Sequence, residues 1–263
     1  MDVIGKDMRV IVQYDPAARL GNRMFQYAYG YILSKKYNCK LFCNEPLLNF
    51  DIDSNPITNF DSKNIKTRDY GEHSFDDNLL ENFDGDIIVN SWLQRSEYYI
   101  EHRNDLRKLF GIKEIEPINN DSLVLHIRET DYKLIGAYLG YECYKKIIDK
   151  YNFNKVKIVT DNPESNCVKE LVKEGCEILS DAVIKQFKIH GDKSVMNDFK
   201  TLLYSSNIGI SQSSFSWWAA FLGYHNKIIF PYKTDLNWWK INPNNDEIDL
   251  YFDLPGVTDK FIL

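Results

Sequence analysis

The chain has 263 residues, of which 27% are charged and 44% hydrophobic, and its formal net charge is −6. This is the composition of an ordinary soluble globular protein with one large domain or two of moderate size. The acidic balance argues against a nucleic-acid binder. No apolar run reaches the roughly 18 residues that a transmembrane helix needs, and Met1 to Arg9 lacks the pattern of a secretory signal.

The five cysteines are dispersed, without a Cys-x-x-Cys pair. Such a set favours buried, reduced thiols over disulfides or a zinc site. We therefore expect a cytoplasmic protein of enzyme size, with a peripheral membrane contact left open.

The N-terminal part predicts a strand, a helix and several short strands. Residues 9–14 form a β-branched run that Asp15-Pro16 ends, and a helical rhythm follows from Met24 to Lys35. Residues 45–86 are rich in Asn, Asp and Pro and predict loops and short pieces. Further elements are expected as strands at 40–43 and 86–90, and as a helix from a cap at Ser96 to about residue 110.

The alternation becomes regular after a candidate linker at 111–121. We expect strands at 122–128, 155–160, 176–180, 207–211 and 227–230, separated by helices at 141–151, 163–174, 195–205 and 214–223. Alternation of this kind predicts a parallel sheet with helices on both faces. The fold class is therefore α/β, with two Rossmann-like halves at 1–116 and 117–263.

The end of the strand expected at 122–128 is the most informative stretch. An apolar run stops at His126, Arg128 and Asp131. Ligands of open α/β sheets bind outside the carboxyl ends of the strands, and a permanently charged guanidinium there suits a phosphate. A strand that merely reaches solvent explains the same residues, so three further segments decide the interpretation.

The loop before the first helix contains Gly21, which permits a tight turn, and Asn22, which can cap the helix. Such a turn presents free backbone N–H groups, although it can also be a turn and nothing more. It has a single glycine and so lacks the Gly-x-Gly-x-x-Gly dinucleotide pattern.

Two later segments also follow expected strands. Asp161 precedes a proline-started helix, where its carboxylate can accept two hydrogen bonds from guanine or act as an N-cap. In the segment 210–220, several serines crowd a strand-to-helix turn, which makes an anion site or a redundantly capped helix. We expect Trp217 and Trp218 to pack in the core.

Two Asp-x-Asp pairs, at Asp51/Asp53 and Asp84/Asp86, have the form that some sugar transferases use for a divalent metal. Both lie in Asn/Asp-rich sequence, where such pairs arise by composition, and we expect neither to bind metal. The histidines at 73, 102, 190 and 225 show no ligand spacing.

Taken together, the four segments resemble the α-1,2-fucosyltransferases of glycosyltransferase family 11. The resemblance covers roughly residues 9–231. It rests on Arg-Leu-Gly-Asn-x-Met-Phe-Gln-Tyr-Ala at 19–28, His-Ile-Arg-x-x-Asp-Tyr at 126–132, Thr-Asp-Asn-Pro-Glu at 160–164 and Ser-Phe-Ser-Trp-Trp-Ala-Ala at 214–220.

This resemblance implies a GT-B-type architecture whose halves face a cleft, with the acceptor on residues 1–116 and the donor on 117–263. It implies an inverting transfer of L-fucose from GDP-β-L-fucose to the 2-hydroxyl of a terminal galactoside, with no metal and no other cofactor. Arg128 would hold the β-phosphate, and Asn22 would reach that phosphate or the acceptor. The other implied donor-binding residues are Gly21, His126 and Asp161, the latter two for guanosine, and Ser213, Ser214, Phe215 and Ser216 around the phosphates.

Three positions depart from the family pattern: Ala18 replaces a glycine, Arg23 a glutamine and Glu129 a second arginine. Glu129 puts an anion next to the expected pyrophosphate site. Either it points away from the ligand, as alternate residues of an extended segment do, or the donor pocket is altered. Arg23 could restore the missing positive charge, which makes it a further donor-binding candidate.

Departure of GDP develops negative charge on the β-phosphate, which a fixed cation and oriented N–H groups must absorb if no metal does. Asp131 and Glu129 are carboxylates near this site that could act as a general base, although Asp131 could equally be a structural cap. Two other functions remain open: a transferase of the same fold with another nucleotide sugar or linkage, and a catalytically silent glycan-binding protein.

Overall fold

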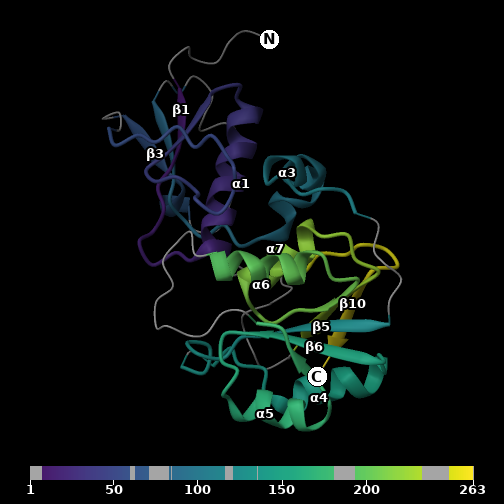
Figure 1. The fold of residues 1–263 in the computed structure, drawn as a ribbon. Coiled ribbons are helices and arrows are strands. Elements are labelled where there is room, and N and C mark those ends of the chain that lie inside the picture. Colours follow the sequence, from purple (N-terminus) through teal and green to yellow (C-terminus); the bar gives the residue numbers. More distant parts are fainter. Residues whose placement is uncertain are drawn as a thin grey trace. The chain divides into compact units, whose positions relative to one another are not determined.

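The protein, shown as a computed structural model in Figure 1, is described at residues 8–59, 63–70, 83, 85–115, 121–134, 136–180, 193–232 and 249–262. It forms two compact units. The first comprises Met1–Gly111 with Ile241–Leu250, and the second Ile112–Lys240 with Tyr251–Leu263. Each unit has its own parallel sheet, so the expected α/β fold with two Rossmann-like halves is confirmed.

The sheet of the first unit has four parallel strands in the order β2-β1-β4-β3. The strands are β1 (Arg9–Val12), β2 (Lys40–Cys43), β3 (Asn64–Lys66) and β4 (Asp86–Val89). Helix α1 (Leu20–Lys36) packs on this sheet (Figure 1). A Cβ atom added at Gly30 would lie 2.6 Å from Cγ2 of Val12, so the absence of a side chain there lets α1 approach β1 closely.

Two expected caps in this unit are wrong. Helix α1 begins at Leu20 after Arg19, which places Asn22 inside the first turn instead of at the cap. The helix expected from Ser96 is broken into η2 (Ser96–Tyr98), η3 (Ile100–His102) and α3 (Arg103–Leu109). The backbone N–H of Ser96 donates to the carbonyl of Asp249, so Ser96 joins a β-bridge segment and does not cap a continuous helix. The short 3-10 helix η1 (Thr67–Tyr70) follows β3.

The sheet of the second unit has six parallel strands in the order β10-β9-β8-β5-β6-β7. Counted from β5, this is the 3-2-1-4-5-6 order of the Rossmann fold, whose order reverses between β5 and β8. The strands are β5 (Ser122–Ile127), β6 (Lys155–Thr160), β7 (Glu177–Ile178), β8 (Asn207–Gly209), β9 (Lys227–Tyr232) and β10 (Thr258–Ile262).

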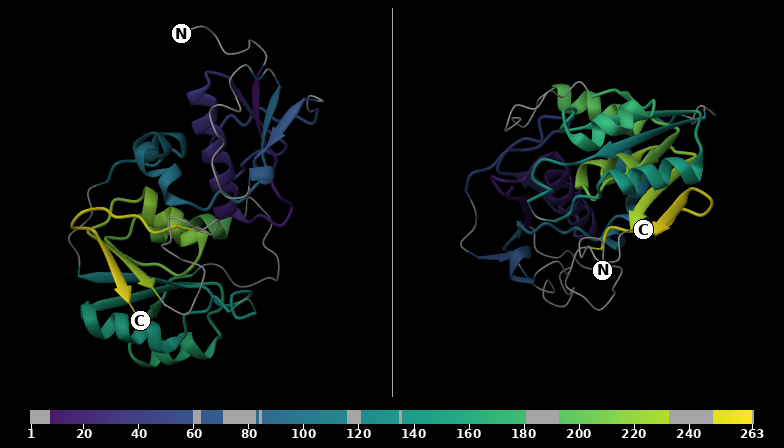
Figure 2. Two further views of the ribbon diagram at one scale, coloured as in Figure 1. Left: turned by 180° about the vertical axis from the view of Figure 1, so that it is seen from behind. Right: turned by 90° about the horizontal axis from the view of Figure 1, so that it is seen from below.

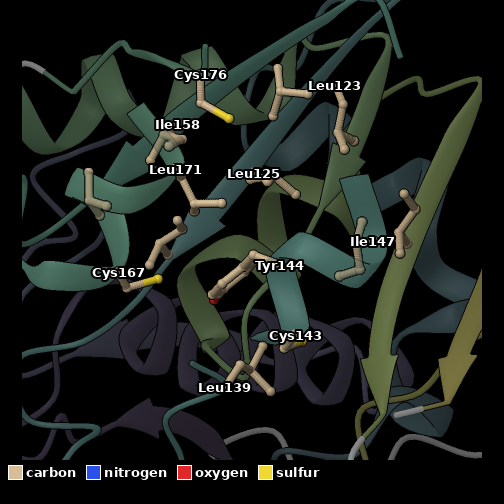
Figure 3. Close-up of a cluster of buried hydrophobic side chains, with 14 of the residues drawn as sticks. Leu123, Leu125, Leu139, Cys143, Tyr144, Ile147, Ile158, Cys167, Leu171 and Cys176 are labelled. Atoms are coloured by element: carbon tan, nitrogen blue, oxygen red, sulfur yellow. The ribbon is translucent and has the colours of Figure 1, made fainter. Parts of the chain in front are cut away.

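Four helices cover this sheet, two on each face (Figures 1 and 2). They are α4 (Tyr141–Tyr151), α5 (Asn166–Lys173), α6 (Lys193–Leu203) and α7 (Ser214–Leu222). The core between the sheet and α4 and α5 is apolar, with Leu125, Tyr144 and Ile158 fully buried (Figure 3). On the α7 side, Trp217 and Trp218 are fully buried, which confirms their expected place in the core. No helix in the described ranges is long and apolar enough to cross a bilayer.

Candidate functional site

Three of the segments singled out in the sequence meet at the carboxyl edge of the second unit's sheet. Strand β5 ends at Ile127, β6 at Thr160 and β8 at Gly209. Strand β5 pairs with both β6 and β8, so the loops that follow these strands are neighbours. The edge between β5 and β8 is the switch point of the sheet, which is where open α/β sheets bind ligands.

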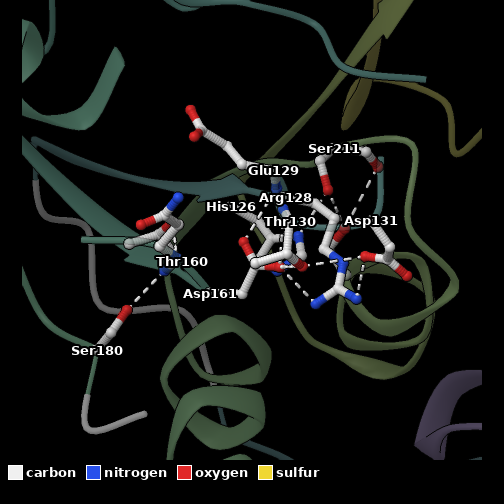
Figure 4. Close-up of polar contacts among 11 residues, drawn as sticks. His126, Arg128, Glu129, Thr130, Asp131, Thr160, Asp161, Ser180 and Ser211 are labelled. Carbon is white, nitrogen blue, oxygen red and sulfur yellow. Dashed lines mark hydrogen bonds and ion pairs between the residues drawn. The ribbon is translucent and has the colours of Figure 1, made fainter. Parts of the chain in front are cut away.

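Arg128 lies between two carboxylates at this edge (Figure 4). Its Nη1 is 2.7 Å from Oδ2 of Asp161, and its Nη2 is 2.6 Å from Oδ1 of Asp131. Its side chain is 16% exposed, and Tyr132 packs its ring 5.5 Å from the guanidinium carbon. The guanidinium is therefore fixed in position but still open to a ligand, because two ion pairs use only part of its five N–H donors.

Asp161 holds the loop that follows β5. One carboxylate oxygen accepts from the backbone N–H of Glu129 at 2.9 Å, and the other from the N–H and hydroxyl of Thr130 at 3.4 and 2.5 Å. It does not cap α5, whose N-cap is Ser165 through a bond to the N–H of Val168. The N-cap alternative for Asp161 is therefore wrong, and its contact with guanine stays a prediction.

Glu129 points away from the Arg128 cluster, as Figure 4 shows. Its side chain is 0% exposed, and its Oε2 lies 2.9 Å from Nζ of Lys133 one turn further on. The carboxylate also lies near Tyr138 and Cys167, where burial and its negative charge raise the pKa of the Tyr138 hydroxyl. Glu129 therefore points away from Arg128 and into the interior, which agrees with the first of its two alternatives, while the position of the ligand itself stays a prediction.

His126 is a bridge between the two strands at the switch point. Its Nδ1 lies 2.7 Å from the hydroxyl of Ser211, and its ring packs 5.6 Å from that of Phe215. The side chain is 4% exposed. Burial lowers the pKa of His126 from 6.5 to about 3, opposed by the charge of Asp161 and reinforced by that of Arg128, so the imidazole is neutral at working pH. The guanosine contact stays a prediction.

The serine turn places a helix N-terminus beside this bridge. Ser213 is the N-cap of α7 and makes no side-chain capping bond. The first hydrogen bond of the helix runs from the N–H of Trp217 to the carbonyl of Ser213 at 2.9 Å. The N–H groups of residues 214–216 precede this bond and therefore take no part in the hydrogen bonding of the helix. Ser216 turns inward, with its hydroxyl donating to the carbonyls of Ser211 and Ser213. Unused N–H groups and the helix dipole suit an anion.

The first-loop candidates belong to the other unit. Asn22 accepts from Nε2 of Gln94 at 2.8 Å, and Gly21 lies in the first turn of α1. Arg23 is buried, donates to the carbonyl of Ala18 and pairs with Oε2 of Glu45 at 2.8 Å. These contacts give Arg23 a role within its own unit, and the donor-binding role of all three residues stays a prediction.

The Asp-x-Asp pairs have other surroundings. Asp86 is 1% exposed and makes a two-pronged ion pair with Arg9, while Asp84 lies outside the described residues. Asp51 and Asp53 line a cavity of about 540 Å³ in the first unit, together with Tyr31 and Lys40. Across the described parts of the chain, no group of three or more His, Cys, Asp or Glu is placed to hold a metal ion.

The sequence did not single out the residues that hold the candidate site residues in position. Thr130 joins Asp161 to the loop, Lys133 neutralises Glu129, and Ser211 joins β8 to His126. A further residue, Gln212, has a buried carboxamide for which the described residues provide no hydrogen-bond partner. For Ser211 and Gln212, the only signal in the sequence is the crowding of polar residues between an expected strand and an expected helix.

The fold and the site define a two-unit α/β protein with a Rossmann-order sheet and an anion-suited switch point. No family model and no curated protein matches the chain. Among solved structures it is similar to the α-1,6-fucosyltransferase NodZ co-crystallised with GDP, with a TM-score of 0.49 and 14% identity over 85% of this chain and 94% of that chain. NodZ from Bradyrhizobium gives the same score over 95% of that chain. A glycosyl transferase of family 9 from Veillonella parvula gives 0.48 and 9% over 100% of this chain and 87% of that chain.

Proposed function

We propose that this protein is an inverting fucosyltransferase that moves L-fucose from GDP-β-L-fucose to the 2-hydroxyl of a terminal galactoside. The observation that carries the proposal is that Arg128 and the N-terminus of α7 follow two neighbouring strands, β5 and β8, at the switch point of the sheet. A fixed guanidinium and a row of free N–H groups form a site for a pyrophosphate. The motif resemblance supplies the sugar, the guanosine base and the linkage.

Arg128 and the first turn of α7 would act on the leaving group. As the bond between the fucose anomeric carbon and the phosphate oxygen breaks, negative charge grows on the β-phosphate. Arg128 is held in place by Asp161 before any ligand arrives, so little reorganisation is needed when that charge develops. The neutral imidazole of His126 keeps the turn that begins at Ser211 in position without adding a charge.

Asp131 is the carboxylate that could serve as a base. Its side chain is 43% exposed, and the structure ties it to Arg128 and Thr130. Glu129 is unsuited to this role because its carboxylate is fully buried and paired with Lys133. Its inward direction argues against an altered donor pocket and so supports GDP-fucose over another nucleotide sugar.

The activity is proposed to need no metal, with Arg128 as the cation that neutralises the leaving group. Incubation with GDP-fucose and a panel of β-galactosides, followed by NMR of the product linkage, tests the reaction directly. Fucose transfer to the 2-hydroxyl that persists in EDTA is the expected result. Titration calorimetry with GDP, GTP and UDP tests the donor base, and a preference for UDP would overturn the guanosine assignment. Absence of GDP release with every acceptor would instead favour a glycan-binding protein.

A further inference from the structure

Gln212 is a buried polar side chain that the fold does not satisfy. It lies between the end of β8 and the N-cap of α7, and it is 4% exposed. Within the described structure, neither its Nε2 nor its Oε1 has a hydrogen-bond partner. A carboxamide buried in this way loses its hydrogen bonds to water without gaining any in return, which is costly and uncommon in folded proteins.

The same strand shows that the fold can satisfy a buried carboxamide. Asn207, at the start of β8, is 6% exposed and donates to the carbonyl of Ser122 at 2.9 Å. The neighbours of Gln212 are also engaged, because Ser211 bonds His126 and the N–H of Ser213 donates to the carbonyl of Ser211. An apolar side chain of the same shape would suit position 212 better if packing were its only task.

Several of the unsatisfied polar groups follow strands at the carboxyl edges of the two sheets, whereas Gln26 of α1 and Asn49 do not. Besides Gln212, the buried atoms without partners in the described residues include the hydroxyls of Tyr14 and Ser91, which follow β1 and β4. These edges are where α/β folds bind ligands. Local destabilisation of this kind is typical of functional sites, where a ligand supplies what the fold leaves out.

We propose that Gln212 is a donor-recognition residue, whose carboxamide hydrogen-bonds the nucleoside diphosphate part of the sugar donor. This inference rests on the proposed function. The site next to Gln212 is the first turn of α7, whose free N–H groups suit the phosphates. Because both amide atoms are buried, the contact forms as the turn at residues 211–213 adjusts to the ligand. The amide then adds a donor and an acceptor to a site that otherwise offers mainly donors.

The test compares two nearly isosteric replacements in the full chain, each measured by thermal unfolding and by calorimetric titration with GDP. We expect Gln212→Met to raise the melting temperature, because it removes an unsatisfied group, and to weaken GDP binding about tenfold, the equivalent of one or two hydrogen bonds. The control is Asn207→Leu, which should lower the melting temperature and leave GDP affinity unchanged. Opposite signs in the two assays distinguish a recognition residue from a structural one.

Two results would overturn the role of Gln212. A lower melting temperature in Gln212→Met would show that the amide stabilises the fold, and unchanged GDP affinity would show that it does not contact the ligand. If the wild-type protein binds GDP but the variant binds it equally well, only this inference fails. If the wild-type protein binds none of GDP, UDP and ADP, the proposed function fails, and this inference fails with it.

Discussion

Replacing Glu129 by glutamine should destabilise the fold without changing the affinity for the donor nucleotide. The carboxylate is fully buried and paired with Lys133, whose side chain is 46% exposed. Glutamine keeps the shape but loses the charge, and Lys133 can recover hydration because it is near the surface. The lost charge-assisted bond is partly offset by the relief of burying an ion, so we expect a loss of about 1–2 kcal/mol in the free energy of unfolding.

Replacing Lys133, the partner of Glu129, should destabilise the fold more than replacing Glu129. Lys133→Met leaves the Glu129 carboxylate buried without its cation, and this costs about 3–5 kcal/mol where an ion pair is broken in a protein interior. Glu129→Arg, which restores the residue usual in the resembling family, would put a guanidinium into a fully buried position beside an ammonium. We expect that variant to be at least as unstable as Lys133→Met.

Urea unfolding gives the stabilities, and calorimetry with GDP gives the affinities. The expected result for Glu129→Gln is a lower unfolding midpoint with a GDP affinity within about twofold of the wild type, because the carboxylate points away from Arg128. A tenfold change in GDP affinity at nearly unchanged stability would refute the reasoning, since it would place Glu129 at the ligand.

Four further predictions concern the cluster at the end of β5. Arg128→Ala should lower turnover by about 10²–10³ in a GDP-release assay, the usual cost of removing one preorganised charge stabiliser; near wild-type turnover would contradict the phosphate assignment. Asp131→Asn removes an exposed anion that competes for Arg128, so GDP should bind about two- to fivefold more tightly by calorimetry, and weaker binding would count against this competition. Asp161→Asn should weaken GDP and IDP binding alike, because Asp161 holds the loop; a loss confined to GDP would show instead that it contacts the guanine amine. Since the folded-state pKa of His126 is depressed to about 3, the folded protein should lose about 1.4 kcal/mol of stability per pH unit as pH falls below 6.5, and His126→Asn should flatten this acid limb in urea unfolding measured from pH 7 to 4.5. An unchanged slope in that variant would place the acid sensitivity elsewhere.

Most of the second unit was predictable from periodicity. The helix expected at 141–151 and the strand expected at 155–160 have those bounds in the structure, because an amphipathic helix and a buried parallel strand leave clear patterns. Strand β10 was not expected. It is a half-buried strand at the edge of the sheet with the sequence Thr-Asp-Lys-Phe-Ile, and so few buried positions give no distinct pattern.

The candidate site was predictable by location but not by contact. Arg128 and the serine turn were predicted because each follows an apolar strand. The two strands are neighbours in the sheet, so the two segments lie at the same place on its edge. The contact between Asp161 and the loop after β5 could not be predicted in this way. Asp161 accepts from the N–H of Glu129, which lies 32 residues earlier in the chain. The direction of Glu129 was open between two alternatives, since alternation predicts a face but not which face meets a ligand.

The charges around Arg128 bear on how an anion could bind there. Two carboxylates face one guanidinium, so these three described side chains together carry a negative charge, and the dipole of α7 contributes only about half a unit charge. A pyrophosphate that takes the place of one of the two carboxylates would remove this excess of negative charge. Asp161 is held more firmly, because its side chain is 17% exposed and accepts from two backbone N–H groups, whereas the Asp131 side chain is 43% exposed. Under the proposed function, the phosphate that takes the place of Asp131 on Arg128 also frees a carboxylate next to the reacting sugar. Capture of the leaving group and release of a potential base would then be one event.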